Sequence, residues 1–252
     1  STISLGSTLT SGYAVIVEIG GTFVGGSGAH TMGSFKVGAN NANAKATFTT
    51  GVTTINAKSN DSNKAIRIAG PNAGFDDGNG TVTFTYAGAI AIQTSTKPFY
   101  NVIVNHASCD ITLIDALTVA NNLTITAGEL DTTGSNFALT VTGDVSVVGT
   151  LTCNASVVAM RSISVAGGTF TAPTGGSSSC TLTGSKYGNA SEDAFSTDSG
   201  STFTAGSGTI TFTGNTQPQI KNLSGENFYH VTINSTGGTP IVETQRDIII
   251  DA

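Results

Sequence analysis

The sequence is poor in helix-forming residues and in charge. It contains no Trp, two Met and three Cys, and charged residues make up 10% of its 252 residues. The strong helix formers Glu, Lys, Gln and Met are scarce, and no segment keeps an apolar period of about 3.6 residues over several turns. These absences exclude a helical bundle and predict almost no α-helix.

Basic residues are few and do not cluster along the chain. The ten Lys and Arg are scattered from Lys36 to Arg246, and the formal net charge is -6. Nucleic acids and anionic membrane surfaces are bound by clustered basic residues, so we expect neither as a partner. No apolar run reaches the roughly 18 residues of a membrane-spanning helix, and we therefore expect no membrane insertion.

The first residues of the chain bear on where the protein is located. STISLGSTLTSG has neither the basic start nor the apolar core of a signal peptide. Either a signal was removed, which implies secretion, or none existed, which fits a virion protein assembled inside a host cell. The expected location is therefore extracellular, at a cell surface or in a virion.

Three cysteines are too few for a disulfide framework, and they lack metal-ligand spacing. Cys153 and Cys180 could form a bridge in an oxidising compartment. The other interpretation is that Cys109, Cys153 and Cys180 are small, half-buried side chains.

The chain contains an internal duplication. GTVTF at 80–84 recurs as GTITF at 208–212, and FYNV at 99–102 recurs as FYHV at 228–231. Both copies alternate apolar residues with Thr, the period of a half-buried β-strand. A fainter match of the N-terminus with 123–151 extends the repeat. We predict β-repeat A over residues 1–121 and β-repeat B over 122–252, with a polar loop at 173–202.

Short strand-like runs recur along the whole chain, separated by Gly, Asn, Asp or Ser. Their spacing tightens to about six to eight residues between Leu117 and Thr171, as the turns of a solenoid require. The predicted fold is all-β, with two tandem β-repeats that form a parallel β-solenoid (β-helix). The alternative is two tandem β-sandwich or jelly-roll domains, which also place a strand every eight to twelve residues or so.

Two phrases, FYNVIVN followed by ITLIDALTVANNLTITAGELDTTGSNFALTV, and SGTITFTGNTQPQIKNLSGENFYHVTIN, resemble repeats of large bacterial and phage surface proteins. Those repeats run F-x-N-L-x-I-N, then L-T-V-x-x-N-L-T-I-x-x-G-x-L-D, then G-T-x-T-F-x-G. They look like parallel β-solenoid segments of adhesins, cell-wall proteins and fibre proteins. The match covers 78–148 and 202–250. The resemblance implies a structural or adhesive role and brings no catalytic motif.

One loop has the oxygen-rich composition that hard cations prefer. Asp76, Asp77 and Asn79 precede a predicted strand, with glycines between and after them. They form a candidate calcium site, although the EF-hand pattern is absent; the alternative is a tight turn before the strand. No other cofactor is predicted.

Polysaccharide-degrading β-helix enzymes need paired carboxylates. Glu129 and Asp131 would share one face of a strand, with Asp144 one strand later and Arg161 the nearest guanidinium. Such an acidic pair is also ordinary decoration of a strand's solvent face. We therefore expect no enzyme, and polysaccharide degradation is the remote alternative.

The histidines are far apart in sequence. His30, His106 and His230 are expected to be polar groups on the outer face.

The expected function is that of a non-enzymatic structural subunit of an extracellular fibre, surface filament or virion appendage. A repeat boundary at each end of the chain predicts strand pairing with further copies, giving a homo-oligomer or filament. The alternative is a carbohydrate- or receptor-binding adhesin module that recognises surface glycans through 173–202. The residues expected to carry assembly are Ile3, Leu5, Leu9, Ile248, Ile249 and Ile250.

Overall fold

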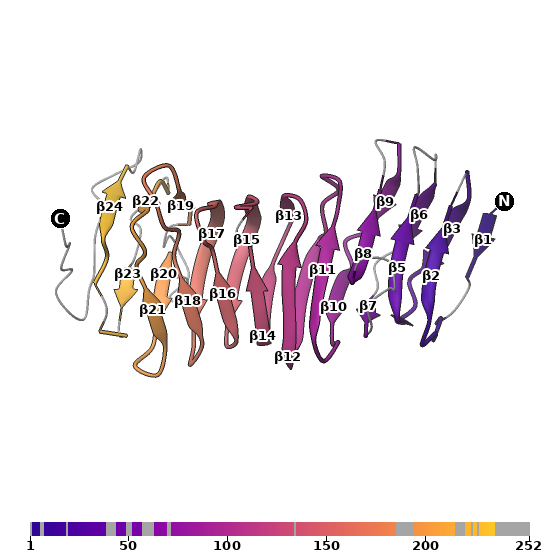
Figure 1. The fold of residues 1–252 in the computed structure, drawn as a ribbon, viewed down its shortest axis with the longest axis horizontal. Coiled ribbons are helices and arrows are strands. Elements are labelled where there is room, and N and C mark those ends of the chain that lie inside the picture. The colour runs from indigo at the N-terminus through magenta and orange to yellow at the C-terminus, as the bar shows by residue number, and fades with distance from the viewer. Residues whose placement is uncertain are drawn as a thin grey trace. The chain divides into compact units, whose positions relative to one another are not determined.

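The computed structural model is all-β, as predicted (Figure 1). Every regular element in the described part of the chain is a β-strand, and nothing there forms a helix able to cross a membrane. The described residues are 2–5, 8–18, 20–38, 44–48, 52–56, 63–69, 72–133, 135–184, 194–214, 220–222, 224–225 and 227–234.

The chain divides into two compact units. The first comprises Ser1–Asn121 with Ala127–Glu129, and the second comprises Asn122–Thr126 with Leu130–Ala252. The first contains β1 (Thr2–Ser4), β2 (Ala14–Val17), β3 (Thr22–Gly26), β4 (His30–Met32), β5 (Ser34–Val37), β6 (Lys45–Phe48), β7 (Val52–Ile55), β8 (Lys64–Ile68), β9 (Gly74–Asp76), β10 (Thr81–Phe84), β11 (Ala89–Gln93), β12 (Asn101–Leu113) and β13 (Leu117–Val119).

β14 (Leu123–Asp131) contributes residues to both units. The second unit continues with β15 (Leu139–Val147), β16 (Thr150–Thr152), β17 (Val157–Val165), β18 (Thr169–Thr171), β19 (Ser179–Leu182), β20 (Phe195–Thr197), β21 (Thr202–Thr204), β22 (Thr209–Phe212), β23 (Ile220–Asn222) and β24 (His230–Ile233).

Strands of the first unit stack in three parallel columns. The first column is β1, β3, β6 and β9. The second is β4, β7, β10 and the start of β12, and the third is β2, β5, β8, β11 and the end of β12. Each turn of the chain therefore adds one strand to each column, which is the arrangement of a parallel β-solenoid.

The second unit repeats this plan. Its columns are β15, β17, β19, β22 and β24; then β14, β15, β17, β20 and β23; then β16, β18 and β21. β15 and β17 are long enough to pass through two columns each. The two units together carry about nine turns. All these ladders are parallel, whereas the sheets of sandwich domains are antiparallel. The prediction of a parallel β-solenoid is therefore confirmed, and the alternative of two sandwich domains is wrong.

The duplicated motif builds the same local step in each unit. Thr81–Phe84 pairs in register with the first four residues of β12, and Thr209–Phe212 pairs in register with His230–Ile233. In the fainter N-terminal match, Thr2 and Ile3 pair with Thr22 and Phe23, and the matched Thr124 and Ile125 pair with Ser146 and Val147. The repeat boundaries at 121 and 122 stay a prediction.

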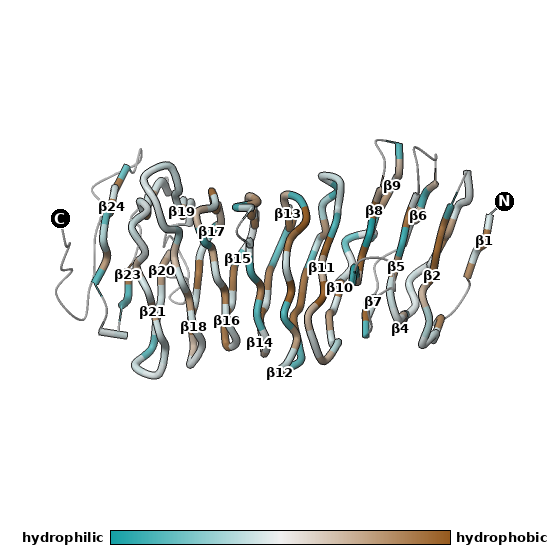
Figure 2. Tube along the Cα trace, viewed as in Figure 1, coloured by the Kyte–Doolittle hydropathy of each residue, from teal (hydrophilic) through white to brown (hydrophobic). Residues whose placement is uncertain are grey.

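Alternation of side chains produces the core. In β10, Val82 and Phe84 are buried while Thr81 and Thr83, which alternate with them, are half-exposed, and β22 has the same pattern. The hydropathy colours show the same change from residue to residue along strands such as β12 (Figure 2). Because successive side chains of a strand point to opposite faces, strands such as β10 and β22 send their apolar residues to the interior and their Thr outward.

Aromatic side chains stack inside each unit. Phe203 in the second unit lies 5.8, 5.1 and 5.2 Å, between ring centroids, from Phe170, Phe195 and Phe228. A similar series in the first unit runs from Phe23 through Phe35 and Phe75 to Phe99. Stacked or edge-to-face contacts of this kind add to the burial of the rings.

Polar side chains form short ladders of hydrogen bonds at the corners. Asn121 Nδ2 donates to Asn101 Oδ1 at 3.0 Å, and Asn101 Nδ2 donates to Thr81 Oγ1 at 3.4 Å. Gly206 turns a corner of the second unit with φ of 65°, and a Cβ there would clash with the Pro173 carbonyl oxygen. The corners thus need particular residues, unlike the outer faces of the strands.

Replacing Phe203 by Ala tests the stacked core. Phe203 is 1% exposed, so the variant loses burial and leaves a cavity among three rings, and we expect a loss of about 3–5 kcal/mol in unfolding free energy. Thr204→Ala, on the exposed side of the same strand, is the matched control and should change stability by less than about 0.5 kcal/mol. Urea unfolding measures both; equal effects would contradict the inward stacking of β21.

Candidate functional site

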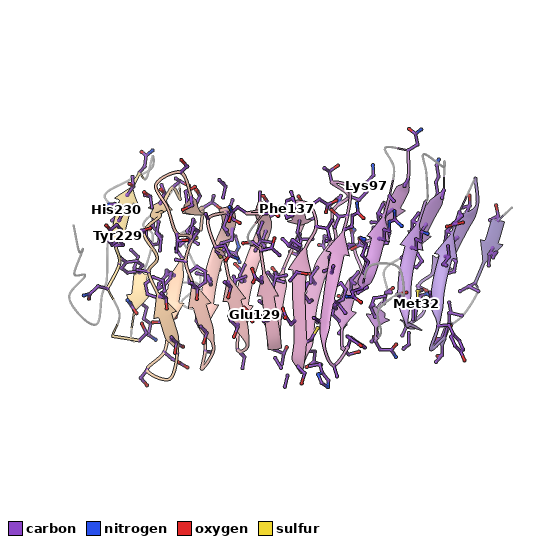
Figure 3. The ribbon with its side chains drawn as sticks, in the orientation of Figure 1. Met32, Lys97, Glu129, Phe137, Tyr229 and His230 are labelled. Atoms are coloured by element: carbon purple, nitrogen blue, oxygen red, sulfur yellow. The ribbon has the colours of Figure 1, made fainter. Side chains whose placement is uncertain are left out.

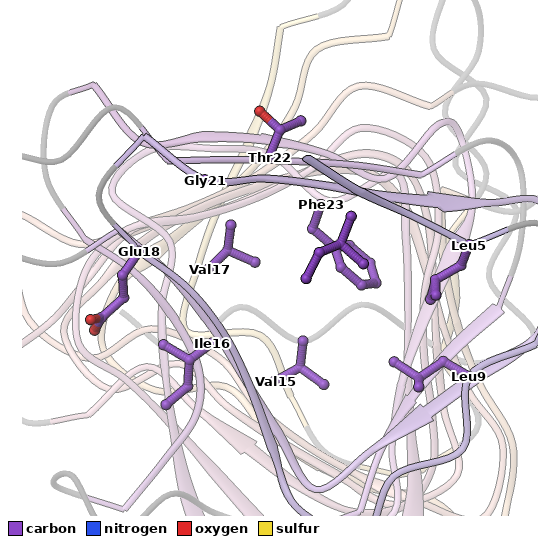
Figure 4. Close-up of a pocket in the computed structure, with 10 residues that line it drawn as sticks. Leu5, Leu9, Val15, Ile16, Val17, Glu18, Gly21, Thr22 and Phe23 are labelled. Carbon is purple, nitrogen blue, oxygen red and sulfur yellow. The ribbon is translucent and has the colours of Figure 1, made fainter. Parts of the chain in front are cut away.

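An apolar cavity lies at the first turn of the first unit (Figure 4). Its volume is about 330 Å³. Three of its lining residues, Ile3, Leu5 and Leu9, are among the six that the sequence nominated for assembly. Val15, Ile16, Val17, Glu18, Gly21, Thr22 and Phe23 complete the lining.

The cavity exists because this turn is covered from one side only, among the described residues. β1 pairs with β3, Thr10 bridges to Thr31, and β2 pairs with β5, and no described strand adds to the opposite edges. As a result Ile3 is 62% exposed, whereas Phe23, its partner in the next turn, is 4% exposed. In later turns the apolar interior is covered by a turn on each side, whereas in this first turn it is open on one side.

Buried His30 positions the connection between β1 and β2. It is 1% exposed, and its Nδ1 accepts a hydrogen bond from the Leu9 backbone N–H at 3.1 Å. The expectation that this histidine is a polar group on the outer face is therefore wrong. The following residues, Thr31 and Met32, continue β4, whose alternation turns both His30 and Met32 inward.

Apolar side chains also extend from the cavity to the outside of the turn. Tyr13 is 84% exposed and Ile16 is 55% exposed. Together with Ile3 they surround strand edges that have backbone N–H and C=O groups available for pairing. Exposed apolar residues beside an unpaired strand edge are a typical protein interaction surface. We call Ile3, Leu5, Leu9, Tyr13 and Ile16 the open turn.

Two of the carboxylates considered for catalysis, Asp131 and Asp144, form contacts with neighbouring strands and turns of the solenoid. Asp131 Oδ1 accepts hydrogen bonds from the Thr133 backbone N–H and from Asn154 Nδ2, both at 2.5 Å. Asp144 accepts a hydrogen bond from Ser162 Oγ at 2.6 Å and forms an ion pair with Arg161. Glu129 is half-buried in β14. These contacts hold corners and neighbouring strands together.

The candidate calcium loop forms the tight turn before β10. Asp76 Oδ1 accepts a hydrogen bond from the Gly78 N–H at 2.9 Å, and Asp77 Oδ2 accepts one from the Tyr100 N–H at 2.5 Å. Asn79 has a left-handed φ of 62°. The described residues contain no group of three or more His, Cys, Asp or Glu able to hold a metal. Calcium binding by Asp76, Asp77 and Asn79 stays a prediction.

All three cysteines are free thiols in the core. Cys109, Cys153 and Cys180 are fully buried rather than half-buried. Burial raises the pKa of Cys180 to about 12 and that of Cys109 to about 11. At neutral pH these groups remain protonated, so they pack as small apolar residues and react slowly.

The remaining histidines differ in surroundings. His106 Nδ1 accepts a hydrogen bond from the Ser108 N–H at 3.1 Å in β12. His230 is exposed at the start of β24, with its ring 4.5 Å from that of Tyr229 (Figure 3). As expected, neither lies in the core.

Two predicted surfaces lie partly outside the described residues. Ile248, Ile249 and Ile250, predicted for assembly, are outside them, and the loop 173–202, predicted for glycan recognition, is described only at 173–184 and 194–202. The sequence analysis missed Tyr13 and Ile16. A wholly apolar run such as AVIV at 14–17, directly after Tyr13, does not reveal which of its side chains are left uncovered.

The geometry defines a class of protein: a parallel β-solenoid with an open apolar turn. No family model, no curated protein and no solved structure matches this chain.

Replacing Asp77 by Asn tests the turn before β10. Burial is the largest influence on the Asp77 carboxyl and raises its pKa above 3.8. A raised pKa in the folded state means that Asp77 stabilises the fold below its unfolded pKa, and that this contribution is lost as pH rises through the folded pKa. The side-chain oxygen of an asparagine can still accept the hydrogen bond from the Tyr100 N–H, but the asparagine cannot ionise.

We therefore expect the Asp77→Asn variant to gain stability relative to the wild type as pH rises from about 3 to about 7. Urea unfolding across this range measures the difference. If the wild type instead becomes more stable relative to the variant over the same pH range, then ionised Asp77 stabilises this turn more than asparagine does, and the prediction is wrong.

Proposed function

We propose that this chain is a non-enzymatic structural subunit of an extracellular fibre, surface filament or virion appendage. Copies associate through the open turn, where Ile3, Leu5 and Leu9 line an uncovered apolar interior beside unpaired strand edges. This open turn is the single observation that carries the proposal. The resemblance of the repeats to those of bacterial and phage surface proteins supports the extracellular or virion setting.

Covering the open turn is energetically favourable. Burial of one exposed Ile side chain contributes about 1.5–3 kcal/mol, and both Ile3 and Ile16 are more than half exposed. A strand added to β1 or β2 would also satisfy the backbone N–H and C=O groups at those edges. The partner that fits is another parallel turn, because it offers strand edges and apolar side chains in the same arrangement.

A second copy of the chain is the proposed source of that turn. An end that meets a different surface on the next copy makes a head-to-tail contact, and repeated head-to-tail contacts produce a ring or an open filament. The complementary surface is expected at Ile248 to Ile250, which lie outside the described residues. A repetitive solenoid with hydroxyl-rich outer faces suits such a filament.

Ile3→Asp tests this assembly. The side chain is 62% exposed, so the charge should leave the fold intact but would have to be buried at a covered turn, which is strongly unfavourable. We expect the wild type to form filaments or a discrete oligomer in electron micrographs and by mass in solution, and the variant to remain monomeric.

Ser4→Asp is the matched control, because it adds the same charge to the adjacent, exposed position of β1. Circular dichroism and thermal unfolding check that both variants fold. A wild type that stays monomeric at high concentration, or an Ile3→Asp variant that assembles like the wild type, would refute association through the open turn.

A further inference from the structure

Threonine side chains form a regular array on one outer face of the second unit. The strands β16, β18 and β21, stacked in the third column of that unit (Figure 1), have the sequences TLT, TFT and TFT. They pair in register, so each outer threonine of one strand lies opposite a threonine of the next. We call the following six residues the threonine array: Thr150, Thr169 and Thr202 in one row, and Thr152, Thr171 and Thr204 in the other.

The threonine array faces solvent because the residues between its two rows fill the core. Leu151, Phe170 and Phe203 are 0, 0 and 1% exposed, whereas the threonines on either side of them are half-buried or exposed. Alternation along a strand therefore places all six threonines on the same outer surface.

Other outer faces of this unit are less uniform. A comparable row in the second column contains Ser146, Ser164, Ser196 and Lys221. By contrast, every outward position of β16, β18 and β21 is Thr, and these strands contain no charged residue. Outward positions of a strand need polar side chains, but the fold does not require the same side chain six times.

Threonine presents a hydroxyl and a methyl group in a defined geometry. Its branched Cβ restricts χ1, so identical side chains on paired strands repeat at the spacing of the backbone. A hydroxyl donates one hydrogen bond and accepts two, and a hydroxyl with one protein partner can therefore still bind water. The threonine array thus offers water molecules binding positions that recur in two directions.

The two repeats of the threonine array are close to those of ice. Neighbouring strands are about 4.8 Å apart, and alternate residues of one strand are about 6.7 Å apart. In ice each oxygen is bonded tetrahedrally at about 2.75 Å, so oxygens that share a neighbour are about 4.5 Å apart and the perpendicular lattice repeat is about 7.4 Å. The array therefore agrees with the lattice to within about a tenth in each direction.

We propose that the threonine array binds the surface of ice crystals. Its hydroxyls hydrogen-bond to water molecules of the lattice, and its methyl groups lie between them, where their hydration shell is already ordered. The site is complete within one chain. It does not depend on association through the open turn.

Ice fits the threonine array better than a macromolecule does. Sugar sites combine apolar or aromatic walls with a few polar groups, but the rings of β18 and β21, Phe170 and Phe203, face the core. Nucleic acid requires clustered cations, and the cores of protein interfaces are rich in large apolar residues. The outer face of these three strands has neither.

Slow freezing of a dilute solution of the full chain around a cold finger tests the proposal. Growing ice excludes dissolved proteins that do not bind it, so serum albumin in the same solution reports the level of exclusion. We expect the wild type to be enriched in the ice relative to albumin, and to slow the growth of grains in recrystallising ice.

Thr171→Lys and Thr204→Lys identify the threonine array as the site. A lysine keeps its ammonium group hydrated and extends above the threonines, so each variant should lower the enrichment over albumin about tenfold or more. Thr140→Lys is the matched control, because Thr140 is exposed on β15 opposite Ala159 and lies outside the array. This variant should be enriched like the wild type.

Circular dichroism confirms that each variant folds. The proposal is overturned if ice excludes the wild type as it excludes albumin. It is also overturned if folded Thr171→Lys and Thr204→Lys are enriched like the wild type, or if Thr140→Lys loses as much enrichment as they do.

Discussion

Each turn of this solenoid depends on the turn beside it. A single turn of three short strands cannot bury its own apolar side chains, because those side chains point into an interior that is open above and below. Stacking in parallel register closes that interior, so that Phe203 is packed between rings from neighbouring turns. Register matters as much as composition, since a slip of one residue would turn Phe203 outward and Thr204 inward.

The open turn follows from the same constraint. Where a turn is present on both sides, inward residues such as Phe23 and Val37 are buried; where none is described on one side, Ile3 is exposed although its strand has the same alternation. The surface that would bind a further turn and the core of the solenoid are therefore made of the same kind of residue. This is why the interaction that stabilises the fold is also the interaction proposed for assembly.

Outside the core, the parallel columns bring together residues from successive turns. Asn101 and Asn121 form a corner ladder, and Lys36 and Arg67 face each other, although each pair is separated by a whole turn of chain. Thr fills outward positions in strands such as β10 and β22, because it favours strands and its hydroxyl can be hydrated.

Local sequence determined the strand content and favoured the parallel solenoid over tandem sandwich domains, because alternation, turn residues and repeats can be read along the chain. It also nominated Ile3, Leu5 and Leu9 for assembly. Only the tertiary structure decided which residues of successive turns meet. It buried His30, placed Arg67 opposite Lys36, and gave Asp131 and Asp144 their hydrogen-bond partners. The physical reason is that loop lengths between strands set the register of each turn on the next, and that register is not encoded in any one segment of the chain.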